Sequence, residues 1–120
     1  MRLFCASDLA FLGPMMAGFD GISSTNSCAL PELILSAYRA IERGDAVTAR
    51  DLHRLWYPFR ALARRHGQPQ TAKAAMNLRG FDGGFVRPPL LDLGRDETAE
   101  VAEVVRALSR DGRSGIRLAA

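Results

Sequence analysis

Only two short segments of this 120-residue chain have the pattern of a buried β-strand, and both lie near its start. Residues 2–6 are an apolar run typical of a buried parallel strand, and residues 19–27 are expected to form a second strand that runs into a hydroxyl-rich loop. A helix between them is expected to end at Gly18, and another to begin at Pro31 and end at Gly44. This order predicts an α/β fold with a parallel sheet, in which ligands bind beside the loops that follow the strands.

A parallel sheet of two strands cannot bury both of its faces and both of its edges. A closed (β/α)8 barrel avoids this problem with its eight strands, and it typically needs about 250 residues. The chain supplies about a quarter of the strands of such a barrel, so the rest is expected to lie upstream or to come from a partner. Several apolar side chains then lack part of their cover, and the chain is expected to self-associate through them. They are Leu3, Phe4, Phe11, Leu12, Met15 and Met16.

Residues 45–111 have a different character, because their apolar side chains recur at helical spacing. Asp45 is expected to cap a helix that extends to about His66. Val47 belongs to the apolar stripe of that helix, and Pro58 in its interior is expected to kink it. The segment is therefore predicted to be a C-terminal helical region.

Two further helices complete the predicted helical region. One covers about 69–79, and the other follows an N-cap at Asp96. The connection between them, residues 81–94, is long and rich in Gly and Pro. Residues 112–120 are expected to form a flexible tail.

The composition restricts the chemistry that the chain can perform. Fifteen of its sixteen basic residues are arginine, and Lys73 is the only lysine, whereas an enzyme that forms an imine needs a lysine amine. Cys5 and Cys28 form no disulfide framework and are expected to be buried, reduced thiols of a cytoplasmic protein. Asp8 and the Gly-Pro pair at 13–14 interrupt the apolar start, which argues against a secretory signal, and no apolar run is long enough to span a membrane.

Four motifs resemble a known enzyme family in their order and spacing. They are Gly18-Phe19-Asp20-Gly21-Ile22-Ser23-Ser24-Thr25 with Pro31-Glu32-Leu33, Ala49-Arg50-Asp51-Leu52-His53-Arg54-Leu55-Trp56-Tyr57-Pro58, Gln68-Pro69-Gln70-Thr71-Ala72-Lys73-Ala74-Ala75-Met76 and Gly83-Gly84-Phe85-Val86-Arg87-Pro88-Pro89-Leu90. Together they are similar to the C-terminal portion of the dihydrodipicolinate synthase and N-acetylneuraminate lyase family, the pyruvate-dependent class I aldolases. The resemblance implies that residues 1–44 are the last two βα units of a TIM barrel and that residues 45–111 are the helices that follow.

The resemblance also implies a function. In that family a strand-six lysine forms a Schiff base with a 2-keto acid, a strand-five tyrosine relays protons, and a threonine pair after strand two holds the carboxylate. All three precede the matched region, so the chain is expected to contain no catalytic residue and to be inactive alone. The intact enzyme is expected to bind a small 2-keto acid, to need no cofactor or metal, and to be a homo-oligomer.

Two substrate-binding segments carry over by resemblance. They are Ala6, Ser7 and Asp8 after strand seven, and Ser23, Ser24 and Thr25 after strand eight. The family usually has glycine where Ala6 stands. Together with Asn26, the second segment has hydroxyl and amide groups that suit a keto acid, although such a loop can equally satisfy its own backbone.

Other residues are expected to have structural roles. Lys73 has no evident acid–base partner, so a structural helix lysine is preferred to a nucleophile. His53 and His66 lack the spacing of a helical metal pair, and packing or solvated side chains are preferred.

Two other classes of function stay open. The chain is alternatively a free-standing structural or interaction protein that folds by self-association. A weaker alternative is a small RNA-binding protein that uses Arg60, Arg64 and Arg65, although solvated arginines on a helix are preferred and no nucleic-acid or membrane partner is expected. Within the enzyme hypothesis, dihydrodipicolinate synthesis, sialic acid cleavage and sugar-acid chemistry remain alternatives.

Overall fold

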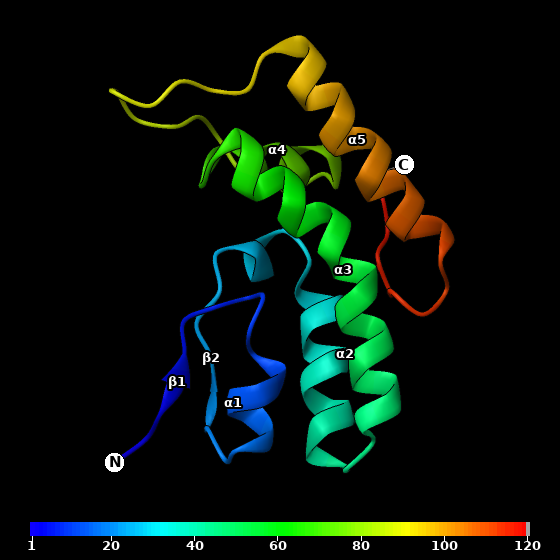
Figure 1. Ribbon diagram of the computed structural model, residues 1–120. Helices are drawn as coiled ribbons and strands as arrows, with labels where there is room; N and C mark the ends of the chain where they lie inside the picture. Colours follow the sequence, from blue (N-terminus) through cyan, green and yellow to red (C-terminus); the bar gives the residue numbers. More distant parts are fainter. Residues whose placement is uncertain (120) are drawn as a thin grey trace.

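The computed structural model describes residues 1–119 and places the two strands side by side. Strand β1 (Phe4–Cys5) pairs in parallel with β2 (Gly21–Ile22), and the short helix α1 (Leu12–Met16) connects them. These three elements lie together at one end of the molecule, with the N-terminus beside β1 (Figure 1). The predicted parallel pair with its helical connection is confirmed, although both strands are shorter than the segments expected to form them.

Two antiparallel helices pack beside the strands. Helix α2 (Pro31–Glu42) has its proline at the first helical position, where the missing N–H costs no helical hydrogen bond. Helix α3 (Ala46–His66) starts as predicted at Asp45, whose Oδ1 accepts a hydrogen bond of 3.0 Å from the backbone N–H of Thr48. The helix continues across Pro58, the position at which the sequence predicts a kink. Helix α3 is therefore long enough to reach from the strands to the opposite end of the molecule (Figure 1).

Helices α4 (Gln70–Leu78) and α5 (Arg95–Arg110) form the opposite end. The prediction that Asp96 caps α5 is wrong, because the N-cap position falls at Gly94. The backbone N–H of Gly94 donates to Oε2 of Glu97 at 2.8 Å. The carboxylate of Glu97, three residues into the helix, thereby gives the N-cap N–H a hydrogen-bond partner. Asp96 lies in the first turn of α5, where its negative charge interacts favourably with the positive N-terminal end of the helix dipole.

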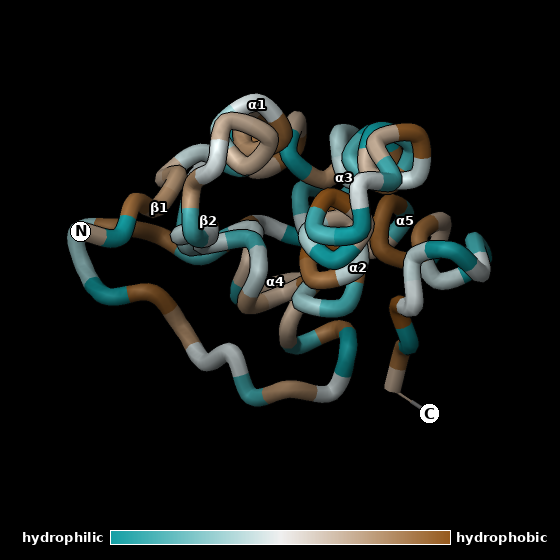
Figure 2. The backbone as a smooth tube through the Cα atoms, turned by 90° about the horizontal axis from the view of Figure 1, so that it is seen from below, coloured by the Kyte–Doolittle hydropathy of each residue, from teal (hydrophilic) through white to brown (hydrophobic). Residues whose placement is uncertain are grey.

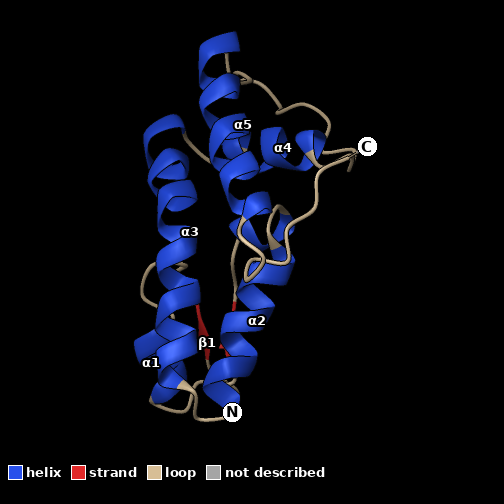
Figure 3. Ribbon diagram, turned by 90° about the vertical axis from the view of Figure 1, so that its right-hand side faces the viewer, coloured by secondary structure: helices blue, strands red, loops and turns tan. Residues whose placement is uncertain are grey.

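The hydrophobic core lies where α2, α3 and α5 meet. The side chains of Trp56 and Phe59 on α3 are almost fully buried, as are Leu33 on α2 and Val101 and Val105 on α5. Figure 2 shows hydrophobic stretches of these three helices next to one another, and Figure 3 shows how little of the chain is strand. Within residues 1–119, no helix combines the length and apolar character needed to cross a membrane.

The side chains near the strands are only partly covered. Phe11 and Met15 are buried, because α1 packs against α2 and α3. Leu3, Phe4 and Met16 are 41%, 57% and 66% exposed. The expected exposure is therefore confirmed for Leu3, Phe4 and Met16 and wrong for Phe11 and Met15.

Two predictions of burial are wrong. Val47, in the first turn of α3, is 60% exposed. Cys28 is also exposed, whereas Cys5 in β1 is buried as predicted.

Residues 114–117, which follow α5, pack against the rest of the molecule. Ser114 is fully buried and donates from its Oγ to the carbonyl of Leu108 at 2.6 Å. Ile116 joins the core, and Nε of Arg79 donates to the carbonyl of Arg117 at 3.0 Å. The prediction of a flexible tail from residue 112 is therefore wrong for residues 114–117, because these contacts fold the segment back onto the helices.

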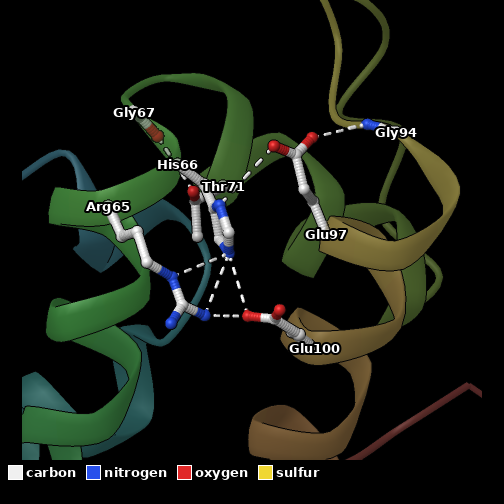
Figure 4. A network of polar contacts seen from close by, with 7 residues as sticks. All are labelled: Arg65, His66, Gly67, Thr71, Gly94, Glu97 and Glu100. Carbon is white, nitrogen blue, oxygen red and sulfur yellow. Dashed lines mark hydrogen bonds and ion pairs between the residues drawn. The ribbon is translucent and has the colours of Figure 1, made fainter.

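A cluster of polar and charged side chains joins the end of α3 to α5. His66 approaches Oε2 of Glu100 at 3.1 Å through Nε2 and Oε1 of Glu97 at 3.7 Å through Nδ1 (Figure 4). Arg65 also pairs with Glu100. His66 therefore has a structural role, in agreement with the prediction of a packing or solvated side chain.

Candidate functional site

A polar cavity of about 290 Å³ opens at the carboxyl ends of the two strands. Its wall contains the six residues predicted to bind substrate, Asn26 of the same loop, and two residues that the sequence did not identify, Arg60 and Gln68. The nine residues are Ala6, Ser7, Asp8, Ser23, Ser24, Thr25, Asn26, Arg60 and Gln68. The parallel pairing of β1 with β2 brings residues 6–8 and 23–25 together, because the loops that follow parallel strands leave the sheet at the same edge.

Two hydroxyl side chains in the wall are fixed by backbone groups. Oγ of Ser7 accepts a hydrogen bond of 3.3 Å from the N–H of Ala10, and Oγ of Ser24 accepts one of 3.0 Å from the N–H of Ser27. These turns orient the hydroxyls, and each hydroxyl keeps its hydrogen as a donor. The interpretation of a loop that satisfies its own backbone is therefore correct for part of the polar capacity of the loop.

A chain of side-chain hydrogen bonds crosses the floor of the cavity. The amide of Asn26, in the short 3-10 helix η1 (Asn26–Cys28), donates to Oδ2 of Asp8 and accepts from the amide nitrogen of Gln68. Asn26 is only 2% exposed and Asp8 9% exposed. The chain connects the loop after β1, the segment after β2 and the connection between α3 and α4, so three separate parts of the sequence hold one another in place.

Three polar atoms in this wall are buried without a hydrogen-bond partner among residues 1–119. They are Oδ1 of Asp8, Nε of Arg60 and Oε1 of Gln68. Buried polar groups are normally paired, since an unpaired one costs about 1–3 kcal/mol. Three such atoms belong to residues of this one cavity, where the loops that follow both strands also meet, so the cavity is the candidate functional site of the described residues.

The sequence did not identify Arg60 and Gln68 as parts of this site. The sequence places Arg60 on a basic helix face with Arg64 and Arg65, and Gln68 in one of the motifs of resemblance. Only the tertiary structure identifies them, because α3 carries Arg60 to the cavity and the connection after α3 carries Gln68 there.

Lys73 lies outside the wall of the cavity. Its Nζ donates to the carbonyl of Gly83 at 2.5 Å, and Gly83 in turn donates from its N–H to Oδ1 of Asn77 at 2.7 Å. These bonds fasten the long connection between α4 and α5 onto α4. The structural interpretation of Lys73 agrees with this position.

The two histidines and the other potential metal-binding side chains do not form a common site within residues 1–119. His53 lies edge-on to the ring of Phe11, with 5.4 Å between the ring centres, and is a packing residue. Residues 1–119 contain no cluster of three or more His, Cys, Asp and Glu side chains with the arrangement of a metal site. The cavity can therefore orient hydroxyl, carbonyl and carboxylate groups of a ligand, and it contains no amine or thiol that could act as a nucleophile.

The sequence is similar to curated lyases. It is 39% identical over 104 residues to a probable 5-dehydro-4-deoxyglucarate dehydratase of Rhizobium meliloti, an alignment that covers 80% of this chain and 33% of that protein. It is 36% identical over 97 residues to a DapA-like lyase of Halobacterium salinarum, covering 80% of this chain and 32% of the relative. The chain thus spans about a third of the length of the curated relatives that it matches.

Solved structures have the same fold over nearly the whole chain. The dihydrodipicolinate synthase of Thermotoga maritima superposes with a TM-score of 0.82 and 23% identity, over 97% of this chain and 37% of that one. The 2-keto-3-deoxygluconate aldolase of Sulfolobus superposes with a TM-score of 0.83 and 22% identity, over 92% and 38%. At these identities the likeness concerns the fold, which is that of part of a TIM-barrel protein.

The family model described as the dihydrodipicolinate synthetase family matches residues 1–108, which is most of the chain and includes the whole wall of the cavity. This match agrees with the curated relatives in sequence and with the solved structures in fold. The chain belongs to the dihydrodipicolinate synthetase family.

Proposed function

We propose that the chain forms one wall of the substrate cleft in a Schiff-base-forming lyase that acts on pyruvate or another 2-keto acid. The observation that carries the proposal is the single polar cavity that unites Ala6 to Asp8 with Ser23 to Thr25. Relatives named as a dehydratase and a lyase support the reaction class, since both names describe cleavage or elimination. The intact enzyme is proposed to be a cytoplasmic homo-oligomer, as the resemblance implies.

We further propose that the chain alone is inactive. Lys73 is its only lysine, and the amine donates to a backbone carbonyl outside the cavity. An imine-forming lysine has to lose its proton beside the substrate, which this position does not favour. Incubation of the chain with pyruvate and borohydride is therefore expected to leave its mass unchanged. A pyruvate adduct on Lys73 at low ligand concentration would overturn this part of the proposal.

A chimaera tests whether the chain functions as part of such an enzyme. The aligned segment of the Rhizobium meliloti relative is replaced by the matching residues of this chain, and turnover of a 2-keto acid is measured. Turnover is expected, and Lys73→Arg in the chimaera is expected to leave it unchanged. A folded chimaera that binds the keto acid normally but depends on Lys73 for turnover would contradict the proposal.

A matched pair of variants in the chimaera tests the cavity itself. Ser24→Ala removes a hydroxyl from the wall, whereas Ser36→Ala removes one from α2, outside it. A neutral hydrogen bond contributes about 1 kcal/mol, so we expect the first variant to raise KM about fivefold and the second to leave it unchanged. Equal effects of the two variants would remove the support for a substrate cleft at this position.

The alternative of a free-standing, self-associating protein has one observation in its favour. Leu3 and Phe4 expose large apolar surfaces at the edge of the small sheet, and such an edge pairs readily with another chain. An inactive chimaera together with a stable oligomer of the chain would favour this alternative.

A further inference from the structure

The chain of hydrogen bonds on the cavity floor has a fixed direction. An ionised carboxylate can only accept hydrogen bonds, so the amide of Asn26 has to turn its NH2 group toward Asp8. The carbonyl oxygen of Asn26 then faces Gln68, which has to donate from Nε2. One orientation of each amide therefore satisfies both bonds, and the charge of Asp8 selects it.

The turn that presents Gln68 is held by contacts of its own. The carbonyl of Gly67 accepts hydrogen bonds from the N–H and the Oγ1 of Thr71 at 3.3 and 2.9 Å. Gly67 has a φ of +96°, a backbone conformation that favours glycine, and Thr71 in α4 is fully buried. Gln68 is therefore positioned by the helical part of the chain, at the start of α4.

Asp8 and Asn26 belong instead to the segments that follow the strands. Within residues 1–119, the hydrogen bond from Asn26 is the one that the side chain of Asp8 receives. The backbone of Asn26 is fixed at the entry to α2, since its carbonyl accepts from the N–H groups of Ala29 and Leu30 at 3.0 and 3.1 Å. Because Asn26 is only 2% exposed, water cannot easily replace a partner that its amide loses.

We propose that Gln68 is a positioning residue of the cleft. By donating to Asn26, it stabilises the amide orientation that holds Asp8, and with it the loop after β1, against the segment after β2. Gln68 acts through Asn26 and needs no contact with a ligand, so the connection after α3 maintains the shape of a cleft formed by the strand loops. This inference rests on the proposed function of the cavity as a substrate cleft.

NMR of the unaltered chain provides one test. The side-chain amide protons of Asn26 and Gln68 are expected to exchange with solvent about tenfold more slowly than those of Asn77, whose side chain is exposed. A scalar coupling from Nε2 of Gln68 to the carbonyl carbon of the Asn26 side chain is expected to show the direction of the bond. Equal exchange rates for the three amides would refute the proposal without any variant.

Reversal of the hydrogen bonds provides a second test. In Gln68→Glu the new carboxylate cannot donate, so it conflicts with the carbonyl of Asn26, and rotation of that amide only moves the conflict to Asp8. Addition of Asp8→Asn removes the conflict, because the new amide at position 8 can donate to Asn26, which in turn donates to the new carboxylate at position 68.

Two control variants separate positioning from charge and from overall stability. Gln70→Glu adds the same charge two residues away, outside the cavity wall. Gly83→Ala places a Cβ 2.8 Å from the carbonyl oxygen of Lys73 and destabilises the fold far from the cleft loops.

The reporters are the backbone N–H groups of Ala10 and Ser27, each bonded to a serine hydroxyl of the cavity wall. Their hydrogen exchange follows local opening of the two loops. Gln68→Glu is expected to accelerate it about tenfold, as for one unpaired buried group, and the added Asp8→Asn to restore it to within about twofold. Both control variants are expected to leave it unchanged.

The chimaera links the loops to substrate binding. Gln68→Glu is expected to raise KM for the keto acid about tenfold with little change in kcat, and Gly83→Ala to change neither. Unchanged loop exchange in Gln68→Glu, failure of Asp8→Asn to restore it, equal effects of Gly83→Ala, or an unchanged KM in an active chimaera would each overturn the inference. An inactive chimaera would count against the proposed function, whereas exchange in the chain itself still decides whether Gln68 positions the loops.

Discussion

Arg79 connects three parts of the chain that are far apart in sequence, and its removal should destabilise the fold strongly. It lies just after α4, and its side chain is only 2% exposed. Its Nη1 donates to the carbonyl of Ala29 at 2.5 Å, and its Nη1 and Nη2 donate to the two carboxylate oxygens of Glu32 at 3.0 and 2.5 Å. With its further bond to the carbonyl of Arg117, the side chain joins α4, the start of α2 and the C-terminal segment.

Arg79→Met keeps most of the buried stem and removes the charge and all four hydrogen bonds. Loss of one partner from a buried ion pair costs about 3–5 kcal/mol. Glu32 is 38% exposed and can regain water, so the low end of that range applies, and we expect a loss of about 3 kcal/mol in the free energy of unfolding. For a chain of 120 residues this corresponds to a decrease in Tm of about 12 °C.

Urea unfolding followed by circular dichroism measures the change in the free energy of unfolding. An unchanged dependence of that free energy on urea concentration shows that the folded and unfolded states of the variant are comparable with those of the original chain. Arg50→Met is the matched control, because Arg50 pairs with Asp51 at 3.2 Å while 52% exposed, and a surface pair contributes about 0–1 kcal/mol. If both variants lose the same small amount of stability, the burial and geometry of the Arg79 pair do not contribute as argued.

Three further predictions concern pH, packing and association. Burial raises the pKa of Glu32, but the hydrogen bond and charge of Arg79 lower it more, so the pKa of Glu32 lies below its ordinary 4.5. The stability that this carboxylate contributes is therefore present above pH 4.5 and is lost as the pH falls through its lower folded pKa. Acid titration of the folded chain should show this loss, and Glu32→Gln should show a smaller one. Gly83→Ala places a Cβ 2.8 Å from the carbonyl oxygen of Lys73 and should cost about 1–3 kcal/mol in urea unfolding, whereas Gly112→Ala, with no atom within 4 Å, should be near neutral. Light scattering should show concentration-dependent association of the chain, which Phe4→Ser should weaken by removing an exposed ring.

The local parts of the fold were predictable from the sequence because their signals are local. Pro31 and Asp45 mark the starts of two helices, and the structure places both starts there. The six predicted cleft residues follow the two strands directly along the chain, so the parallel order of the strands was enough to bring them to one edge. That they bind a substrate remains a proposal.

The parts that the sequence did not predict depend on contacts between distant residues. Arg60 has the same helical environment in sequence as its exposed neighbours, and only the path of α3 over the strands distinguishes it. Ser114 and Ile116 follow the last helix in a stretch without any periodic pattern, and they are held by contacts with Leu108 and the core. Helical periodicity identifies one buried face, but it cannot identify a polar residue that faces a cavity formed by other elements.

The chemistry of the cavity wall separates recognition from covalent catalysis. Its side chains are hydroxyls, amides, one carboxylate and one guanidinium, and each of these can bind and orient an acid or a hydroxyl group. A guanidinium stays protonated at any physiological pH and cannot form an imine, while the single lysine amine of the chain donates to the carbonyl of Gly83 outside the cavity. In the enzyme proposed above, the lysine would come from another part of the barrel, and the proposed contribution of this chain to the reaction is the binding and placement of the substrate.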